Sequence, residues 1–256
     1  MARIIVVTGG KGGVGKTTVA AALAACLAKK GERTIVCDAD FGLNNIDVTL
    51  GVEKQVAYEI ADIVEGKCRA KQALVPHPKI PNLFVLCSKR SDLQRYVSAQ
   101  QIKAVLESLS QEFDYIFIDS PAGIDEGFHR AVAPASEAIV VTAPHISAVR
   151  DADKAVTILK SYELSKVSLV VNGCRGELIL SGEELSPDQI ASVLKLPLLG
   201  IVPYEYSLSV SDFSVPHKSI RLLAESLKTG KEKLYDPTRQ YSGFFGSIKR
   251  ALKRSL

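Results

Sequence analysis

Residues 9–18, GGKGGVGKTT, have the composition and spacing of a phosphate-binding loop. The glycines allow successive backbone N–H groups to point at an anion, and a helix that begins at the loop adds the positive end of its dipole. We therefore expect Lys16 to bind the β- and γ-phosphates of a nucleoside triphosphate and the Thr17 hydroxyl to bind Mg²⁺. A further lysine, Lys11, stands five residues earlier, where an ordinary phosphate loop needs none. The residues expected to line the nucleotide are Gly10, Lys11, Gly12, Gly13, Val14, Gly15, Lys16, Thr17 and Thr18.

Carboxylates follow two further apolar runs. Residues 34–37 lead into Asp38 and Asp40, and residues 115–118 lead into Asp119. A carboxylate at a strand end beside a phosphate loop can hold Mg²⁺, directly or through water, or can orient an attacking water molecule. We predict Asp38 and Asp119 as metal-binding residues and Gly123 as a flexible point that responds to the γ-phosphate. Either aspartate alone could instead close a turn or cap a helix.

No glutamate base is evident beside these segments. Phosphoryl transfer can rest mainly on positioning and charge neutralisation, so we expect slow hydrolysis that a partner accelerates. A nucleotide-switched scaffold with negligible turnover stays open as an alternative, because the sequence indicates a nucleotide site more directly than it indicates turnover.

The elements that must position these residues alternate between strand and helix patterns. Such alternation predicts a doubly wound, mostly parallel α/β sheet with helices on both faces and ligands beyond the carboxyl ends of its strands. The predicted strands are residues 3–8, 34–37, 83–86, 115–118, 138–142, 167–171 and 198–202. The predicted helices are residues 17–29, 57–64, 98–110, 149–162, 187–194 and 217–227.

The composition of the 256-residue chain limits the classes of protein to consider. With 46% hydrophobic residues it can build a substantial core, and its five scattered cysteines fit a reducing cytoplasm better than a disulfide framework. We expect Cys26 and Cys37 to be small buried side chains. The net charge is +4, yet the residues after Asp236 contribute +5, so residues 1–238 carry −1. The body of the chain is therefore not a general binder of nucleic acid.

The end of the chain has a different character. Residues 236–242 read as a linker between a nucleotide-binding domain, residues 1–235, and an amphipathic helix, residues 243–256. On a helical wheel Phe244, Phe245, Ile248 and Leu252 share one face, while Lys249 and Lys253 lie on the other. This pattern is typical of a helix that lies in the surface of an anionic membrane. A terminal helix packed on the domain, or a basic face that binds nucleic acid, would be the alternatives.

The motifs GKGGVGKTT, DAD and IDSPAG resemble those of the deviant Walker A superfamily, which includes MinD, ParA and the nitrogenase iron protein. The resemblance implies that Lys11 crosses a face-to-face dimer to the partner's ATP, and that Lys11, Lys16 and Asp40 act in catalysis. It also implies two switch segments and an asparagine that binds adenine. The switch residues are Asp38, Asp40, Asn45, Asp119 and Gly123, and the adenine-binding residue is Asn172.

Within this superfamily the chain is most similar to the MinD branch, through MARIIVVTGGKGGVGKTT, DADFGLNNID, DSPAGIDEGF and SAVRDADK. That similarity implies an ATP-dependent homodimer on the inner face of the cell membrane. It also implies two partners, a MinC-like division inhibitor and a MinE-like or other regulator that stimulates hydrolysis. Asp151 is the candidate partner contact, although it could instead cap a helix.

Of the other branches, two are alternatives and the nitrogenase-type reading fails. A ParA-like DNA-segregation ATPase would need a basic dimer surface, and a flagellar-number regulator usually carries an extension before the phosphate loop. A nitrogenase-type reductase needs two cysteines for a shared cluster, and Cys87 has no companion between residues 88 and 173.

Overall fold

The computed structural model describes residues 1–41, 46–88, 97–204, 213 and 215–242. Its centre is an eight-stranded sheet in the order β3-β4-β2-β5-β1-β6-β7-β8, in which only the β3–β4 pair is antiparallel. This architecture confirms the predicted doubly wound, mostly parallel fold. The strands are β1 (Arg3–Thr8), β2 (Thr34–Asp38), β3 (Leu74–Pro76), β4 (Leu83–Leu86), β5 (Tyr115–Asp119), β6 (Glu137–Thr142), β7 (Lys166–Cys174) and β8 (Leu198–Pro203).

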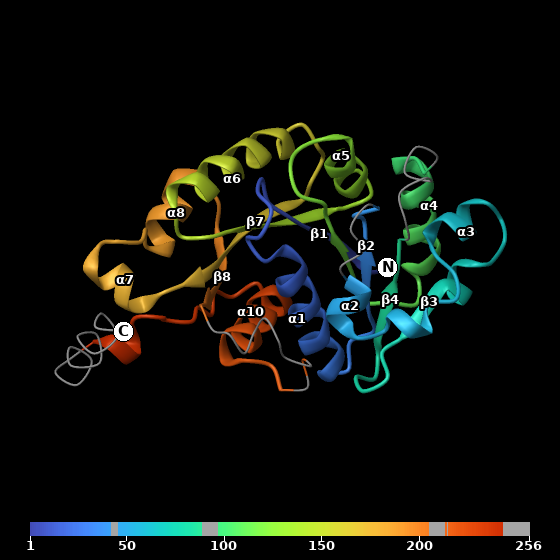
Figure 1. The fold of residues 1–256 in the computed structure, drawn as a ribbon, viewed down its shortest axis with the longest axis horizontal. Helices are drawn as coiled ribbons and strands as arrows, with labels where there is room; N and C mark the ends of the chain where they lie inside the picture. The colour runs from blue at the N-terminus through green and yellow to red at the C-terminus, as the bar shows by residue number, and fades with distance from the viewer. Residues whose placement is uncertain (42–45, 89–96, 205–212, 214, 243–256) are drawn as a thin grey trace.

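Helices cover both faces of the sheet (Figure 1). The α-helices are α1 (Lys16–Lys29), α2 (Ile46–Leu50), α3 (Ile60–Val64), α4 (Ala99–Leu109), α5 (Glu126–Val132), α6 (Ile146–Leu159), α7 (Gly176–Ser181), α8 (Pro187–Leu194) and α10 (Lys218–Thr229). The 3₁₀ helices are η1 (Glu53–Gln55), η2 (Ala70–Ala73) and η4 (Arg239–Tyr241). None of the helices within the described ranges is long and apolar enough to cross a membrane.

Two apolar layers hold the sheet, one on each face. In β1 the side chains of Ile5 and Val7 join the layer formed with α1, α2 and α10, while Ile4 and Val6 join the layer formed with α4, α5, α6 and α8. Because successive strand residues point to opposite faces and both faces are covered, the central strands read as continuous apolar runs.

Helix α1 is buried nearly all round. Its side chains from Val19 to Ala28 are all buried, and most of them are alanines, so the helix can lie close to the sheet and to α2 and α10 at once. The loop of residues 9–15 connects β1 to this helix, and its position is therefore fixed from both ends.

Several predicted boundaries were wrong. The helix predicted from residue 57 begins at Ile60, where Glu59 and Asp62 form a capping box, and the helix predicted from residue 149 begins at Ile146 after His145. The short elements α2, α5, α7 and β3 were not predicted. Cys26 and Cys37 are buried, as expected.

Residues 236–242, the predicted linker, pack on the body. The Tyr241 side chain is 4% exposed and η4 contacts α7. A Cβ atom added to Gly176, the first residue of α7, would lie 2.0 Å from the carbonyl oxygen of Pro237, so the two backbones touch. The segment is therefore fixed in place up to the point where residues 243–256 begin.

Candidate functional site

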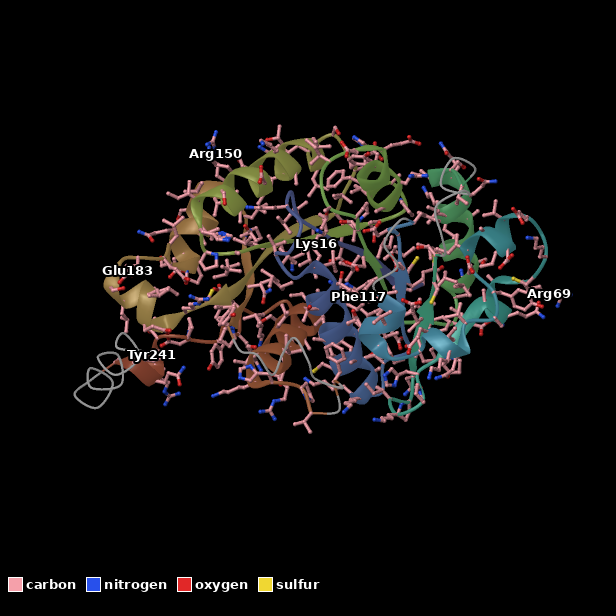
Figure 2. All side chains as sticks on the ribbon, in the orientation of Figure 1. Lys16, Arg69, Phe117, Arg150, Glu183 and Tyr241 are labelled. Carbon is pink, nitrogen blue, oxygen red and sulfur yellow. The ribbon has the colours of Figure 1, made fainter. Side chains whose placement is uncertain are left out.

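The candidate site lies at the carboxyl ends of the parallel strands, on both sides of β1. From β1 the chain runs to β2 on one side, and from β5 it crosses to β6 on the other side of β1, so the connections diverge at this strand. Such a reversal opens a crevice at the strand ends of doubly wound sheets. Figure 2 shows Lys16 near the centre of the molecule, at the start of α1.

The loop before α1 has the backbone that its glycines were expected to provide. Gly13 and Gly15 have φ values of 77° and 93°, in the left-handed region that favours glycine, and Gly15 forms the N-cap of α1. The carbonyl oxygen of Gly15 accepts the Val19 N–H at 2.9 Å, which starts the helix directly behind the loop. The N-terminus of α1 thus faces the space above the loop.

Lys16 is 7% exposed, and its Nζ donates to the carbonyl oxygen of Lys11 at 3.2 Å. Burial lowers the pKa of this ammonium group, while Asp119 and Asp40 oppose that shift. The two loop lysines are thus connected through one hydrogen bond. Lys11 itself is exposed, and its Nζ donates to the Ser147 hydroxyl of α6 at 3.3 Å.

Asp38 and Asp119 are the last residues of β2 and β5 and stand opposite each other in register. They are 1% and 3% exposed. Burial, more than any neighbour, raises the pKa of each carboxyl to about 7. Asp38 accepts the backbone N–H of Asp40 at 2.8 Å and that of Ile46 at 3.5 Å, so it ties α2 to the end of β2.

The surroundings of the Asp119 carboxylate suit the binding of a cation. The Thr17 hydroxyl forms a hydrogen bond with its carboxylate, and Oδ1 is buried without a hydrogen-bond partner among the described residues. A buried carboxylate oxygen that lacks a donor is costly unless a proton or a metal ion satisfies it. The hydroxyl and carboxylate oxygens of Thr17 and Asp119 are ligands that suit Mg²⁺.

A cavity of about 630 Å³ brings together most of the predicted loop residues and the predicted metal ligands Thr17 and Asp119, whereas Asp38 does not line it. Its wall includes Lys16, Thr17, Asp40 and Asp119, together with Ser120, whose hydroxyl bonds to Thr8 at 2.9 Å and fixes the end of β5 against β1. Gly123 has a φ of 86° in the loop that follows. Of the remaining switch residues, Asn45 lies outside the described residues.

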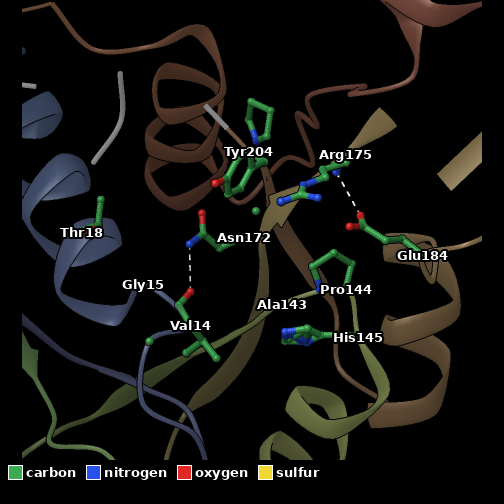
Figure 3. Close-up of a pocket in the computed structure, with 13 residues that line it drawn as sticks. Val14, Gly15, Thr18, Ala143, Pro144, His145, Asn172, Arg175, Glu184 and Tyr204 are labelled. Atoms are coloured by element: carbon green, nitrogen blue, oxygen red, sulfur yellow. Dashed lines mark hydrogen bonds between the residues drawn. The ribbon is translucent and has the colours of Figure 1, made fainter. Parts of the chain in front are cut away.

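A second cavity of about 500 Å³ adjoins the loop at Val14 and Gly15 (Figure 3). Asn172 lines it, and its Nδ2 donates to the carbonyl oxygen of Val14 at 2.8 Å. The prediction that Asn172 follows the end of its strand was wrong, because β7 continues to Cys174 with a register shift against β8. A Cβ atom on Gly15 would lie 2.2 Å from this Asn172 nitrogen.

Sequence reasoning missed the residues that close this second cavity. The Arg175 guanidinium lies 4.3 Å from the centre of the Tyr204 ring, and the Arg175 backbone N–H donates to Glu184 at 3.1 Å. Pro144 and His145 form the opposite wall (Figure 3). Arg175, Tyr204, Pro144 and His145 directly follow the carboxyl ends of β7, β8 and β6, and this position was the signal that could have found them. Glu184 comes from the loop after α7, and no such signal marks it.

The candidate partner residue, Asp151, lies on α6, next to the loop. A Cβ atom on Gly10 would lie 1.8 Å from the Asp151 carbonyl oxygen, so the loop rests directly on α6. The Asp151 carboxylate pairs with Lys154 at 3.0 Å. A helix-capping role for Asp151 was wrong, because α6 begins five residues earlier. The predicted membrane residues lie outside the described residues; they are Phe244, Phe245, Ile248, Lys249, Leu252 and Lys253.

Comparison with known proteins gives concordant results. The family model described as an AAA domain matches residues 2–168. The septum site-determining protein MinD of Synechocystis is 44% identical over 82% of this chain and 79% of its own length. The MinC:MinD cell division complex of Aquifex aeolicus contains a chain of similar structure, with a TM-score of 0.82, 33% identity and coverage of 90% and 97%. MinD of Pyrococcus horikoshii, solved with Mg-ADP, is similar with a TM-score of 0.78, 27% identity and coverage of 90% and 97%.

Proposed function

The chain belongs to the family of MinD septum site-determining proteins, and on this premise we propose that it is an ATP-operated switch that helps to place the division septum. With ATP bound, two copies pair face to face and bind the inner face of the cell membrane through residues 243–256. The dimer then brings a MinC-like division inhibitor to the membrane. Hydrolysis separates the two copies and releases them.

One observation carries this proposal. The wall of the 630 Å³ cavity presents Lys16, Thr17, Asp40 and Asp119 together, and Lys11 stands exposed beside it. Lysine and helix N–H groups bind phosphates, and the carboxylates and hydroxyl bind a metal ion, so the site has both halves of the chemistry that phosphoryl transfer requires.

Lys16 is positioned to neutralise the phosphates. Its side chain is buried, and its Nζ donates one hydrogen bond to the Lys11 carbonyl oxygen. A phosphate oxygen would take the place of that carbonyl oxygen as the acceptor. A charged donor in a site that excludes water stabilises the negative charge that develops in the transition state more strongly than it would in water.

Lys11 is positioned to act outside its own subunit. Its side chain is exposed, and among the described residues its ammonium group bonds only to the Ser147 hydroxyl, at 3.3 Å, so it can leave that hydroxyl at little cost. A second copy that covers the loop would receive this lysine at its own γ-phosphate, where it would act as an arginine finger does. The dimer is therefore the state that completes each site.

Asp38, Asp119 and Thr17 are the residues that would hold Mg²⁺, Thr17 directly and the carboxylates directly or through water. When bound, the ion would neutralise charge between the β- and γ-phosphates. Asp40 is the residue on the cavity wall that can orient an attacking water molecule. Because no glutamate lines this cavity in the part of the chain that the structure describes, we expect slow turnover that a MinE-like or other regulator accelerates.

Asn172 supports adenine as the base. Its amide nitrogen is held by the loop at Val14, which leaves its carbonyl oxygen free to accept a hydrogen bond from the amino group of adenine. The cavity volume of about 500 Å³ is ample for a purine.

Helix α6 supports the partner assignment. It contacts the loop at Gly10 and carries Asp151, so a change in the loop can alter the surface to which a protein on α6 binds. The MinC:MinD complex of Aquifex aeolicus gives the kind of partner to expect. We propose that a MinC-like inhibitor and the hydrolysis-stimulating regulator compete for this helix.

Cosedimentation with anionic vesicles in ATP and in ADP tests the proposal. The full chain should pellet with ATP and stay in the supernatant with ADP, and light scattering should show a dimer with ATP only. Phe245→Asp or Ile248→Asp should abolish pelleting and leave nucleotide binding unchanged. Equal pelleting in both nucleotides, or a monomer with unhydrolysed ATP bound, would refute the switch.

A further inference from the structure

A second surface feature lies beside the start of residues 243–256. A cavity of about 300 Å³ opens between the first turns of α10 and the segment 234–240. Its floor is apolar and comes from Leu222, Leu234 and Tyr235, and its rim carries Lys218 and Arg239. We call it the root pocket. The nucleotide site does not use any of these residues.

The rim of the root pocket is cationic. Lys218 and Arg239 are exposed and form no ion pair with another described residue. Asp236, which also lines the pocket, already accepts the Thr238 N–H at 2.8 Å and the Thr238 hydroxyl at 2.6 Å. The pocket therefore combines two cations and one carboxylate at its mouth, a net charge of +1, with an apolar floor.

The root pocket has a fixed place relative to the end of the chain. Arg239 belongs to η4, which is held by the buried Tyr241 and by the close contact between Gly176 and Pro237. Residue 243 follows Arg239 by four positions, which an extended chain spans in about 14 Å. A membrane that holds residues 243–256 would therefore lie within reach of the pocket. Figure 2 shows Tyr241 at one end of the molecule and Arg69 at the other.

We propose that the root pocket binds the headgroup phosphate of an anionic phospholipid, so that the folded body and residues 243–256 grip the membrane together. This inference rests on the proposed membrane attachment. Lys218 and Arg239 bind the phosphate oxygens, and the apolar floor accepts the first carbons of the lipid glycerol and chains. One phosphate fits a small concave site, whereas a nucleic acid needs a basic track along the body, and residues 1–238 carry a net charge of −1.

Vesicle binding by a charge-removing variant tests the proposal. The vesicles contain equal amounts of dioleoylphosphatidylglycerol and dioleoylphosphatidylcholine, and the full chain is present with ATP. Each basic residue at an anionic surface contributes about fivefold to binding, so Lys218→Gln with Arg239→Gln should weaken it about 25-fold. ATP hydrolysis should not change, because neither residue lines the nucleotide cavities.

The matched control removes the same charge elsewhere. Lys54→Gln with Arg69→Gln removes two exposed cations, one in η1 and one directly before η2. This double variant should leave vesicle binding unchanged. If both double variants bind vesicles equally more weakly than the wild type, or if neither does, the proposal that the root pocket binds lipid is wrong. A loss of duplex DNA retention without a loss of vesicle binding would overturn it as well.

A second measurement does not depend on membrane attachment by residues 243–256. Dihexanoylphosphatidylglycerol below its micelle concentration should shift the NMR signals of Leu222, Leu234 and Tyr235 to saturation in the wild-type chain. The Lys218→Gln, Arg239→Gln variant should show no such shift. An absent shift in the wild type, or an equal shift with dihexanoylphosphatidylcholine, would overturn the proposal. If the wild type fails to pellet with vesicles but shows the lipid-specific shift, only the proposed attachment through residues 243–256 fails.

Discussion

Asp119→Asn should make the protein more stable in the absence of nucleotide and Mg²⁺, although it removes a residue of the proposed metal site. The Asp119 carboxyl is 3% exposed and its Oδ1 has no hydrogen-bond partner among the described residues. Burial raises its pKa from 3.8 to about 7; the Thr17 hydroxyl and Lys16 oppose the rise, and Asp40 adds to it. An asparagine has nearly the same shape and carries no charge to bury.

The size and sign of the effect follow from proton linkage. A carboxyl whose pKa is higher in the folded protein binds its proton more tightly there, so the free energy of unfolding falls as the pH rises from about 4 to 7. At 1.36 kcal/mol per pKa unit, the ionised wild type loses about 4 kcal/mol by pH 8. The variant avoids this loss. It should therefore melt roughly 8–16 °C above the wild type at pH 8, and with nearly the same midpoint at pH 4.

Thermal melts at pH 4 and pH 8 in the presence of a chelator measure this difference. Asp153→Asn, which changes an exposed carboxylate on α6, is the control and should leave the midpoint unchanged at both values. Mg²⁺ with ADP should then stabilise the wild type much more than the Asp119→Asn variant. A gain in stability that is the same at both pH values, or absent at pH 8, would refute the assignment of Asp119 as a buried carboxyl waiting for a cation.

Three further predictions concern the nucleotide loop and its neighbours. Lys16→Ala should abolish ATP binding. Lys11→Ala should keep ATP binding but lose both the ATP-dependent dimer and hydrolysis. Calorimetry measures ATP binding and light scattering measures the dimer, so together they distinguish the two variants. Gly15→Ala should weaken nucleotide binding at least about tenfold in a fluorescence titration, because φ is 93° and the new Cβ would lie 2.2 Å from Asn172 Nδ2. Asp151→Asn should reduce recruitment of a MinC-like inhibitor to vesicles by about tenfold and leave vesicle binding itself unchanged, as cosedimentation would show.

Each of these three predictions has a control variant or an outcome that would contradict it. Gly182→Ala introduces a side chain at a φ of 78° but meets no atom within 4 Å, so it should strain α7 without weakening nucleotide binding. Asp153→Asn should leave recruitment unchanged, and a loss equal to that of Asp151→Asn would show that only the charge of α6 matters. Hydrolysis at background level in the wild type and in both lysine variants would favour a scaffold over an ATPase.

The sequence predicted much of the sheet and of the phosphate site for one physical reason. Parallel strands buried on both faces are continuous apolar runs, and their polar continuations meet at one edge of the sheet. Asp38 and Asp119 were found this way, and the structure places them opposite each other at the ends of β2 and β5. Lys16 followed from the loop spacing alone. The contacts that these side chains make, such as the bond from Lys16 to the Lys11 carbonyl oxygen, needed the fold.

The missed features depend on which elements become neighbours. Arg175 meets Tyr204 only because β7 and β8 are adjacent in the sheet, and strand order is not encoded in hydrophobic periodicity. Strand β3 has three residues and ends in proline, too little for a periodic pattern. Residues 236–242 are polar and read as a linker, yet Tyr241 is buried against α7, a helix too short to be recognised.

The burial of α1 on all sides determines where motion can occur during a round of ATP turnover. A helix that touches the sheet, α2 and α10 through close-packed alanines cannot rotate or slide without opening gaps in the core, and such gaps are costly. In the proposed cycle, the loop at the start of α1 therefore keeps its position when a phosphate is lost, and the response to that loss falls to residues outside α1, such as Asp119. The nucleotide would then stay bound while the surface offered to partners changes.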